Sequence, residues 1–353
     1  MILQDTVSKI VYGVAIGDAI GFPYQFVGRQ TRKLQPVIDM GISQGLDGKH
    51  YKVDESLMGL WSDDASLTLC LAESLAQGYD LQDMSSRFVR WLEDGYLSAQ
   101  DDAFDIGHQT WKAIAELKKI LSKGDLQLLG QRMHRPSLTA NGNGALMRIL
   151  PLVCYIYHKP VAEQFQIVQE VSALTHPHIR SVLCCFLYLR IAERLIDQVG
   201  LAEAVRESQK EVKDFIESEL SNGLDSQQAR IATPQHHKPL DSEDQKQLYR
   251  LLNNDMDQGS TDPDAWDQDD YIRSDGYVIS SLEAALWCLL NSSNYKETML
   301  KAVNLGDDTD TVAAIAGGLA ALYYGYDSIP QEWIRSLKKP EIFERIIKLY
   351  EEI

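Results

Sequence analysis

The chain has 353 residues, of which 44% are hydrophobic and 24% are charged. These proportions are typical of a folded globular protein with a sizeable core, arranged as one large domain or two. The formal net charge of −17 argues against nonspecific binding to nucleic acid or to an anionic membrane, because both depend on a basic protein surface.

Apolar residues recur at helical spacing along most of the chain, whereas the alternating pattern of strands is scarce. The sequence therefore predicts an all-α fold, in which residues 1–353 form a single compact helical domain. The expected helices cover residues 10–20, 67–75, 161–174, 181–199 and 282–290. Glycine and proline mark the connections between them, including a loop expected over residues 28–48.

The first acidic cluster is Ser62-Asp63-Asp64, which stands directly before an apolar pattern of helical spacing that begins at Leu67. Helix capping is the simple interpretation, because Ser and Asp are preferred N-cap residues and acidic side chains stabilise a first helical turn. Capping needs only one such side chain, however. The second carboxylate is left without a role by that interpretation.

The second acidic cluster is Asp307-Asp308-Thr309-Asp310-Thr311, and it precedes an apolar helix rich in small residues over positions 312–325. Three carboxylates crowded at the buried end of a closely packed helix would be costly unless a cation neutralised them. This cost favours one metal site built from both clusters, between the N-termini of two helices. Oxygen ligands without cysteine or histidine suit Mg²⁺ or Mn²⁺ rather than zinc.

Seven motifs, taken in chain order, resemble those of the ADP-ribosylglycohydrolase family, which includes dinitrogenase reductase-activating glycohydrolase and the ADP-ribosyl-arginine hydrolases. They are the glycine-rich stretch 13–21, Trp61 to Asp64, Phe104-Asp105-Ile106-Gly107, residues 141–148, Thr175-His176, Gly276-Tyr277 with residues 282–287, and Gly306 to Thr311. A single short motif carries a real risk of chance agreement. Seven in the same order, over almost the whole chain, identify it as a member of this family.

The resemblance implies a metal-dependent hydrolase that removes ADP-ribose from a modified protein. It implies two divalent cations, Mg²⁺ or Mn²⁺, with six ligands in this chain: Ser62, Asp63, Asp64, Asp308, Asp310 and Thr311. Cleavage of the glycosidic bond builds positive charge at the anomeric carbon, which Asp63 or Asp64 could stabilise while helping to deprotonate the incoming water. The resemblance also promotes Asp105, facing the leaving group, over the alternative that it only caps a helix.

ADP-ribose carries a pyrophosphate, so an acidic protein must bind it with metal ions, helix N-termini or backbone amides. The segment Asn141, Gly142, Asn143 and Gly144 suits this purpose because glycine permits close backbone approach. From the residues alone, an ordinary loop before a buried helix is an equally good interpretation. The resemblance favours ligand contact, and it implies the same for Met147, His176 and Tyr277.

Other histidines and aromatic residues have simpler interpretations. By spacing, His178 and the pair His236-His237 could bind a metal, but a proline-bounded loop and a polar surface stretch explain them better. Tyr277 could be a core aromatic residue, but the resemblance implies that it lies against the ribose or adenine part of the ligand. Five cysteines, among them the adjacent Cys184 and Cys185 in an apolar stretch, predict reduced core thiols rather than a disulfide framework.

Residues 241–275 form the clearest shift in composition, with eleven acidic residues against three basic ones. Such a segment is typical of a solvated or mobile face. Because Gly276-Tyr277 and the second acidic cluster follow it, we expect a variable acidic excursion of one domain, not a linker between two. No segment is apolar and long enough to cross a bilayer, and Met1 to Asp5 lacks the basic start of a secretory signal, so we expect a cytoplasmic protein.

One position departs from the family pattern. Many relatives carry glutamate where this chain has Gln25, which forms hydrogen bonds but cannot accept a proton as a carboxylate does. Two classes of function stay open: a hydrolase, with arginine preferred over serine or another linkage, and a catalytically weak ADP-ribose binder or inhibitor of an ADP-ribosyltransferase. The intact acidic clusters favour the enzyme, acting on an ADP-ribosylated protein.

Overall fold

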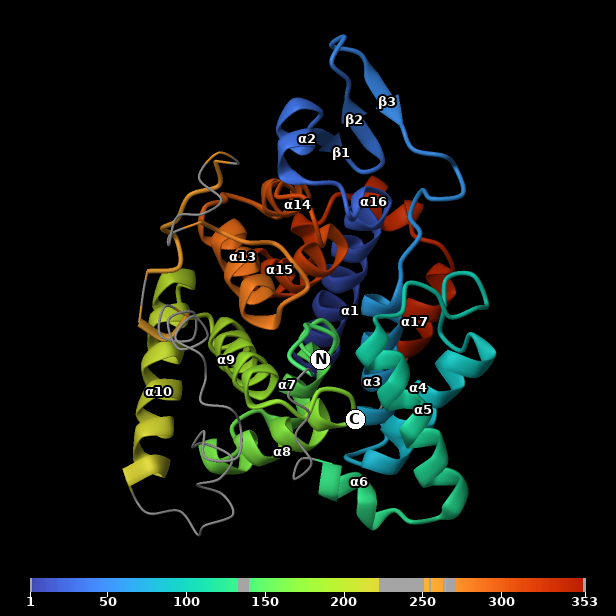
Figure 1. The fold of residues 1–353 in the computed structure, drawn as a ribbon, viewed down its shortest axis with the longest axis vertical. Helices are drawn as coiled ribbons and strands as arrows, with labels where there is room; N and C mark the ends of the chain where they lie inside the picture. The colour runs from blue at the N-terminus through green and yellow to red at the C-terminus, as the bar shows by residue number, and fades with distance from the viewer. Residues whose placement is uncertain are drawn as a thin grey trace.

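Two helices from opposite ends of the sequence, α1 (Ile2–Gly21) and α15 (Thr309–Tyr324), pack against each other in the middle of the molecule (Figure 1). They run antiparallel along a seam of small residues. A β-carbon on Gly13 would lie 2.5 Å from the carbonyl oxygen of Gly317, and one on Gly17 would lie 2.1 Å from that of Ala313. Only glycine allows two helix backbones to approach this closely.

The computed structural model describes residues 2–132, 140–221, 251–253, 255–262, 264 and 271–351. The remaining helices in these ranges are α2 (Arg29–Leu34), α3 (Asp63–Leu75), α4 (Leu81–Asp94), α5 (His108–Lys123), α6 (Gln127–Gln131), α7 (Val153–Ile156), α8 (Val161–Ala173), α9 (Ile179–Ile196), α10 (Leu201–Ser221), α13 (Val278–Leu290), α14 (Tyr295–Asn304), α16 (Gln331–Ser336) and α17 (Pro340–Lys348). Short 3-10 turns lie at Phe22–Tyr24, Leu150–Leu152 and Tyr326–Ser328. The mainly helical, single-domain fold is as predicted.

Helices α13 and α9 pack beside the central pair, and nearly all their residues are buried. In Figure 1, α8 and α10 lie with α9 on one side of the pair, while α3, α4 and α5 lie on the other. All five cysteines are free, and four of them are buried, as the sequence predicted. Within the described residues, no helix combines the length and apolar character needed to cross a membrane.

The loop predicted for residues 28–48 is wrong, because this region contains α2 and two strands. Strands β1 (Val37–Asp39), β2 (Ile42–Gln44) and β3 (His50–Lys52) form a small antiparallel sheet at one end of the molecule (Figure 1). Each strand has three residues, too few to display an alternating pattern. The sheet is instead held from outside, since the Asn304 side chain of α14 bonds to both backbone groups of Val37.

Candidate functional site

The starts of α3 and α15 meet at the end of the central helix pair where α1 finishes. The hydroxyl of Thr309 donates a hydrogen bond of 2.9 Å to the carbonyl oxygen of Gly21. The hydroxyl of Thr311 lies 3.4 Å from a carboxylate oxygen of Asp64. The antiparallel packing of α1 on α15 thus brings together the two acidic clusters, although most of the chain separates them.

The acidic residues at the start of α3 do not cap that helix. Asp18 of α1 does so instead, accepting hydrogen bonds from the backbone N–H groups of Ser62, at 2.8 and 3.0 Å, and of Ala65, at 2.9 Å. Ser62, at the N-cap position, makes no capping bond with its side chain, and neither does Asp308 before α15. The capping interpretation therefore fails for both positions.

Sequence reasoning did not assign a role to Asp18, which is completely buried. Its burial is the main cause that raises the pKa of its carboxyl to about 7. A signal was present, because Asp18 is the one charged residue between Ile10 and Gly21 in an otherwise apolar, glycine-rich helix. A charge at such a position needs a buried partner, which here is the start of α3.

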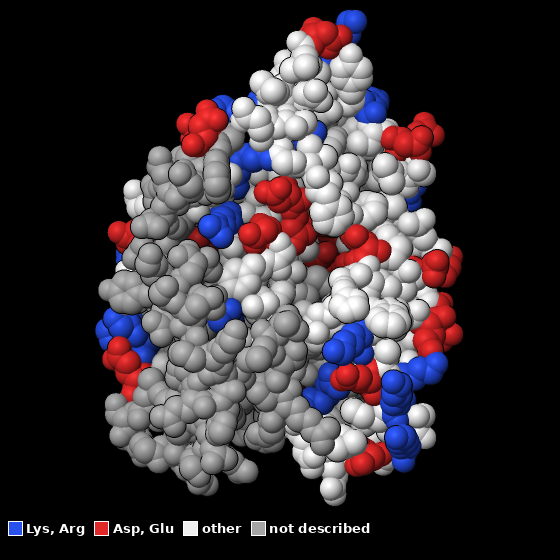
Figure 2. All heavy atoms as spheres, viewed as in Figure 1, with Lys and Arg blue, Asp and Glu red and all other residues white. Residues whose placement is uncertain are grey.

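The carboxylates of this site repel one another in a buried setting. Burial is the largest cause that raises the pKa values of Asp63, Asp64 and Asp310 well above their usual range, followed by the charges of neighbouring carboxylates. The pKa of Asp308 is raised by burial as well. Acidic side chains gather around the middle of the face shown in Figure 2. Such a cluster is costly without a compensating positive charge.

A divalent cation would fit this donor set. Oδ1 of Asp64 is buried and has no hydrogen-bond partner, and the neighbouring donors are carboxylate and hydroxyl oxygens. Hard cations such as Mg²⁺ and Mn²⁺ bind such oxygens. Among the residues that the structure describes, no group of three or more acidic, histidine or cysteine side chains is arranged so that it could hold a metal ion. The two-cation site therefore stays a prediction that the donor chemistry supports.

Asp105 lies close to the first cluster, and its charge is the second largest cause of the raised pKa of Asp63. One of its carboxylate oxygens accepts a hydrogen bond of 2.9 Å from the side-chain amide of Gln25. It does not cap α5, whose N-cap position is Gly107. Gln25, the residue that departs from the family pattern, thus forms a hydrogen bond with Asp105, the carboxylate predicted to face the leaving group.

Three non-glycine residues around the acidic clusters adopt positive φ angles: Phe26 at 60°, Asp105 at 56° and Asp307 at 59°. The N–H of Phe26 donates a hydrogen bond of 2.7 Å to the carbonyl oxygen of Asp307, which locks two of these residues together. The Phe26 side chain is 78% exposed. Backbone conformations of this kind cost about 1–3 kcal/mol each and concentrate at functional sites.

The loop from Asn141 to Gly144 lies beside Tyr277. The N–H of Asn143 donates to the carbonyl oxygen of Gly276 at 3.1 Å, and Gly142 pairs with Tyr277 in an isolated antiparallel bridge. The side-chain amide of Asn143 also donates to Asp308, at 2.7 Å. Two predicted substrate-binding segments and the second acidic cluster are thus neighbours. No α-helix follows the loop directly, since residues 144–148 form turns.

His176 lies against the same loop. A β-carbon on Gly144 would lie 2.7 Å from Cε1 of His176, so glycine makes room for the imidazole ring. Burial and the nearby Arg148 lower the pKa of His176 to about 3, which keeps the ring neutral. Met147 is buried in the core below the loop, and its N–H donates to the carbonyl oxygen of Asn143.

His178 has a structural role, since its ring accepts a hydrogen bond from the N–H of Arg180 and caps α9. His236 and His237 lie outside the described residues, as does most of the acidic excursion, namely residues 241–250, 254, 263 and 265–270. In the described part, the N–H of Ile272 bonds to the carbonyl oxygen of Ser260. The guanidinium of Arg29 donates to the carbonyl oxygen of Ile272, which joins this segment to α2.

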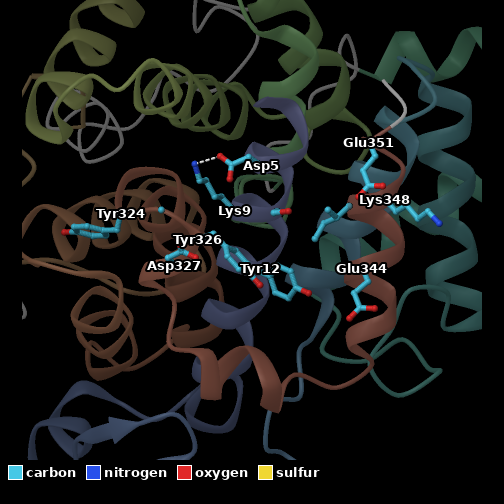
Figure 3. A pocket seen from close by; sticks show the side chains of 12 residues that line it. Asp5, Lys9, Tyr12, Tyr324, Tyr326, Asp327, Glu344, Lys348 and Glu351 are labelled. Atoms are coloured by element: carbon cyan, nitrogen blue, oxygen red, sulfur yellow. Dashed lines mark ion pairs between the residues drawn. The ribbon is translucent and has the colours of Figure 1, made fainter. Parts of the chain in front are cut away.

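A groove lies at the other end of the central helix pair, away from the acidic clusters (Figure 3). It encloses about 660 Å³, and Tyr12, Tyr326 and Glu344 are among the residues that line it. Asp5 and Lys9 at its edge form an ion pair of 2.5 Å. The residues of α1 that line it run from Asp5 to Tyr12, whereas the acidic clusters lie beside the end of this helix at Gly21. None of the predicted site residues lines it.

Comparison with known proteins gives a consistent result. A sequence profile described as ADP-ribosylglycohydrolase matches residues 1–353. A Pseudomonas putida (strain GB-1) protein named ADP-ribosylarginine hydrolase Tri1 is 30% identical over 339 residues, which cover 94% of this chain and 74% of that protein. The Rhodospirillum rubrum ADP-ribosyl-[dinitrogen reductase] glycohydrolase is 23% identical over 92% of this chain and 87% of its own length.

A solved structure titled ADP-ribosylglycohydrolase-related protein complex superimposes with a TM-score of 0.65 and 25% sequence identity. The alignment covers 99% of this chain and 98% of that one. The similarity therefore extends over the complete fold of both chains and is not confined to one motif.

Proposed function

The chain belongs to the ADP-ribosylglycohydrolase family, and on that premise we propose that it is a metal-dependent hydrolase that releases ADP-ribose from modified proteins, preferentially from arginine. The observation that carries this proposal is the convergence of two buried acidic helix starts beside the Asn141 to Gly144 loop. Two relatives named ADP-ribosylarginine hydrolase, 30% and 29% identical, support the choice of arginine.

Two divalent cations, Mg²⁺ or Mn²⁺, would be held by Ser62, Asp63, Asp64, Asp308, Asp310 and Thr311. When bound, they would neutralise the carboxylates and act as Lewis acids toward oxygen atoms of the substrate and of water. The buried Oδ1 of Asp64, which lacks a hydrogen-bond partner, supports this assignment. Asn143 would keep Asp308 in place through its 2.7 Å hydrogen bond.

The bond to be broken joins the anomeric carbon of ribose to a guanidinium nitrogen. Asp63 or Asp64 would take a proton from the water molecule whose oxygen bonds to the anomeric carbon. The guanidinium of the substrate would leave with the bonding electron pair as a neutral guanidine, and it would then take up the proton removed from water to become guanidinium again. Asp105 would pair with the departing guanidinium, because carboxylates bind that group with two parallel hydrogen bonds. Gln25 would hold Asp105 in position by donating to it.

The ADP-ribose group would rest on the loop of Asn141, Gly142, Asn143 and Gly144, with His176 and Tyr277 at its sides and Met147 supporting the loop from below. Backbone amides and a neutral imidazole supply hydrogen-bond donors to a pyrophosphate without requiring a basic surface. The lowered pKa of His176 supports a neutral donor here. A net charge of −17 is therefore compatible with an anionic ligand.

The experiment is hydrolysis of peptides that carry ADP-ribose on arginine or on serine, with and without Mg²⁺ or Mn²⁺. We expect cation-dependent release from arginine, and a loss of more than about a hundredfold in Asp308→Asn, because the variant removes a charged ligand. The matched control is Asp307→Asn, a neighbouring exposed residue at φ 59°, a conformation that Asn tolerates.

Full activity after complete chelation, or in Asp308→Asn, would refute the metal assignment. Release from serine alone would refute the linkage preference and leave family membership intact. Gln25 favours the second candidate function, a catalytically weak binder of ADP-ribose, because it provides no carboxylate. Tight ADP-ribose binding without release from either peptide would establish that candidate.

We further propose that the acidic excursion of residues 241–275 shapes access for protein substrates. Its described part lies near α2, where Lys33 and Asp262 form an ion pair of 3.3 Å. Exchanging the exposed Asp257, Asp262 and Asp264 for asparagine should slow hydrolysis of a modified protein more than that of ADP-ribosyl-arginine. Equal rates on the protein before and after the exchange would refute this role.

A further inference from the structure

Arg148 is a cation enclosed in the protein core, where its side chain is 0% exposed. No ion pair joins it to a carboxylate among the described residues. One of its nitrogens, Nη2, donates to the carbonyl oxygen of Val171 at 3.2 Å and to the hydroxyl of Thr175 at 2.9 Å. Its Nε and Nη1 atoms have no hydrogen-bond partner. Its guanidinium lies 4.6 Å from the ring centroid of Phe88.

Such a position is costly for the fold. Burial lowers the pKa of Arg148 to about 10, so the side chain keeps its charge at neutral pH. A buried charge with incomplete hydrogen bonding destabilises a protein, and an apolar side chain of similar size would be the more stable choice. Arg148 therefore needs a role that offsets this cost, and we look for that role at its two hydrogen-bond partners, Val171 and Thr175.

The hydroxyl of Thr175 connects Arg148 to the ligand loop. Its oxygen accepts from Arg148 and lies 2.9 Å from Nδ1 of His176. Arginine can only donate hydrogen bonds, so it uses a lone pair of the Thr175 oxygen and leaves the hydroxyl hydrogen to be directed elsewhere. An unprotonated Nδ1 is the acceptor within reach.

We propose that Arg148 is a positioning residue that acts through Thr175 to hold His176 in the tautomer with its hydrogen on Nε2. In this arrangement every donor points the same way, from Arg148 to Thr175, from Thr175 to His176, and from His176 toward the loop. Nε2 of His176 lies 3.6 Å from the place that a β-carbon on Gly142 would take. His176 thus presents an N–H group to whatever binds on the loop.

The other tautomer would behave differently. With its hydrogen on Nδ1, His176 would donate to a Thr175 oxygen that already accepts from Arg148, and it would turn a bare nitrogen toward the loop. A bare nitrogen repels phosphate and carbonyl oxygens, whereas Nε2–H binds them. The positive charge of Arg148 also opposes a second proton on the ring, as the lowered pKa of His176 reflects. The series of hydrogen bonds from Arg148 through Thr175 to His176, which we call the relay, therefore favours a ligand with acceptor oxygens. That this ligand is ADP-ribose rests on the proposed function.

The test reads the tautomer directly, by two-bond proton-nitrogen correlation spectra of the full chain labelled with ¹⁵N in its histidine rings. For His176 we expect a protonated Nε2 and an unprotonated Nδ1. Thr175→Val should abolish that signature, and Thr175→Ser, which keeps the hydroxyl, should retain it. His178 is the internal control, because its ring caps α9 by accepting from the N–H of Arg180, and its spectrum should not change in either variant.

A second measurement is ADP-ribose binding by calorimetry. Thr175→Val should weaken binding by about tenfold, the loss of one hydrogen bond to a charged group, while Thr175→Ser stays within about twofold of wild type. If Arg148→Met folds, it should give the same His176 spectrum as Thr175→Val. If it does not fold, the two Thr175 variants alone test the relay. A hydrogen on Nδ1 in wild type, or an unchanged His176 spectrum in Thr175→Val, would overturn the relay. The predicted spectra without any ADP-ribose binding would uphold the relay and reject the proposed function.

Discussion

The glycine seam between α1 and α15 allows a sharp test through Gly17→Ala. The new β-carbon would lie 2.1 Å from the carbonyl oxygen of Ala313, so the two helices must separate by about 1.3 Å to reach ordinary contact at 3.4 Å. Overpacking against a buried backbone costs about 3 kcal/mol, and the higher helix propensity of alanine returns about 1 kcal/mol. We expect Gly17→Ala to lower the free energy of unfolding by about 2 kcal/mol.

The same displacement should weaken cation binding. Helix α1 carries Asp18, which fixes the start of α3, whereas α15 carries Asp310, so separating the helices separates the two acidic clusters. Metal sites require ligand distances within about 0.2 Å of their ideal values. Urea unfolding measures the stability change, and calorimetric titration with Mn²⁺ measures cation affinity, which should fall by more than tenfold.

Two controls test the reasoning. Gly130→Ala makes the same change in α6, where no described atom lies within 4 Å of the added methyl group, and it should raise stability by about 0.5–1 kcal/mol. Adding Ala313→Gly to Gly17→Ala should not rescue stability, because the obstacle is a carbonyl oxygen and not the alanine methyl group. Gly17→Ala with wild-type stability and Mn²⁺ affinity would refute the proposed coupling between the seam and the site.

Three further variants probe the surroundings of the clusters. Gln25→Glu replaces the amide that donates to Asp105 with a second carboxylate, so the two side chains should repel each other and change the rate or the linkage preference of hydrolysis, while Mn²⁺ affinity stays within a few fold. The pKa of His176 is about 3 when folded, below its ordinary value of about 6.5, so its contribution to stability is complete above pH 6.5 and is lost as pH falls toward 3. In urea unfolding, His176→Gln should therefore reduce the loss of stability on acidification by up to about 1.4 kcal/mol per pH unit, and parallel curves for variant and wild type would contradict this. Phe26→Gly relieves a positive φ angle at an exposed residue, so it should raise the melting temperature by the equivalent of about 1 kcal/mol, and an unchanged or lower value would contradict the assigned strain.

The sequence predicted the helical fold well, because the spacing of apolar residues within a short segment indicates which face of a helix is buried. The starts of α3 and α15 were also readable, since hydroxyl and acidic residues directly precede each apolar pattern. Their meeting could be inferred from the cost of burying three carboxylates in one cluster. These features depend on short segments and on charge, both of which a single sequence displays.

Features that depend on contacts between distant residues were not predictable. Asp18 caps α3 although 44 positions separate it from Ser62 in the sequence. The residues next to Ser62 give no indication that its N–H group has a partner in α1. The sheet of β1, β2 and β3 is supported by α14 and not by its own pattern. Arg148 belongs to the motif of residues 141–148, but only the packed core reveals that its hydroxyl partner adjoins His176.

The packing of α1 on α15 also has a consequence for biosynthesis. The bond between Thr309 and Gly21 closes a loop of 288 positions, so α1 leaves the ribosome long before its partner exists. At 5–20 residues per second, that delay is about 15–60 s. During this interval the nascent chain exposes an apolar, glycine-lined helix that carries an unneutralised aspartate, which is a natural target for a chaperone. Neither acidic cluster can meet the other until α15 has been made, so the complete acidic centre is among the last parts of the molecule to form.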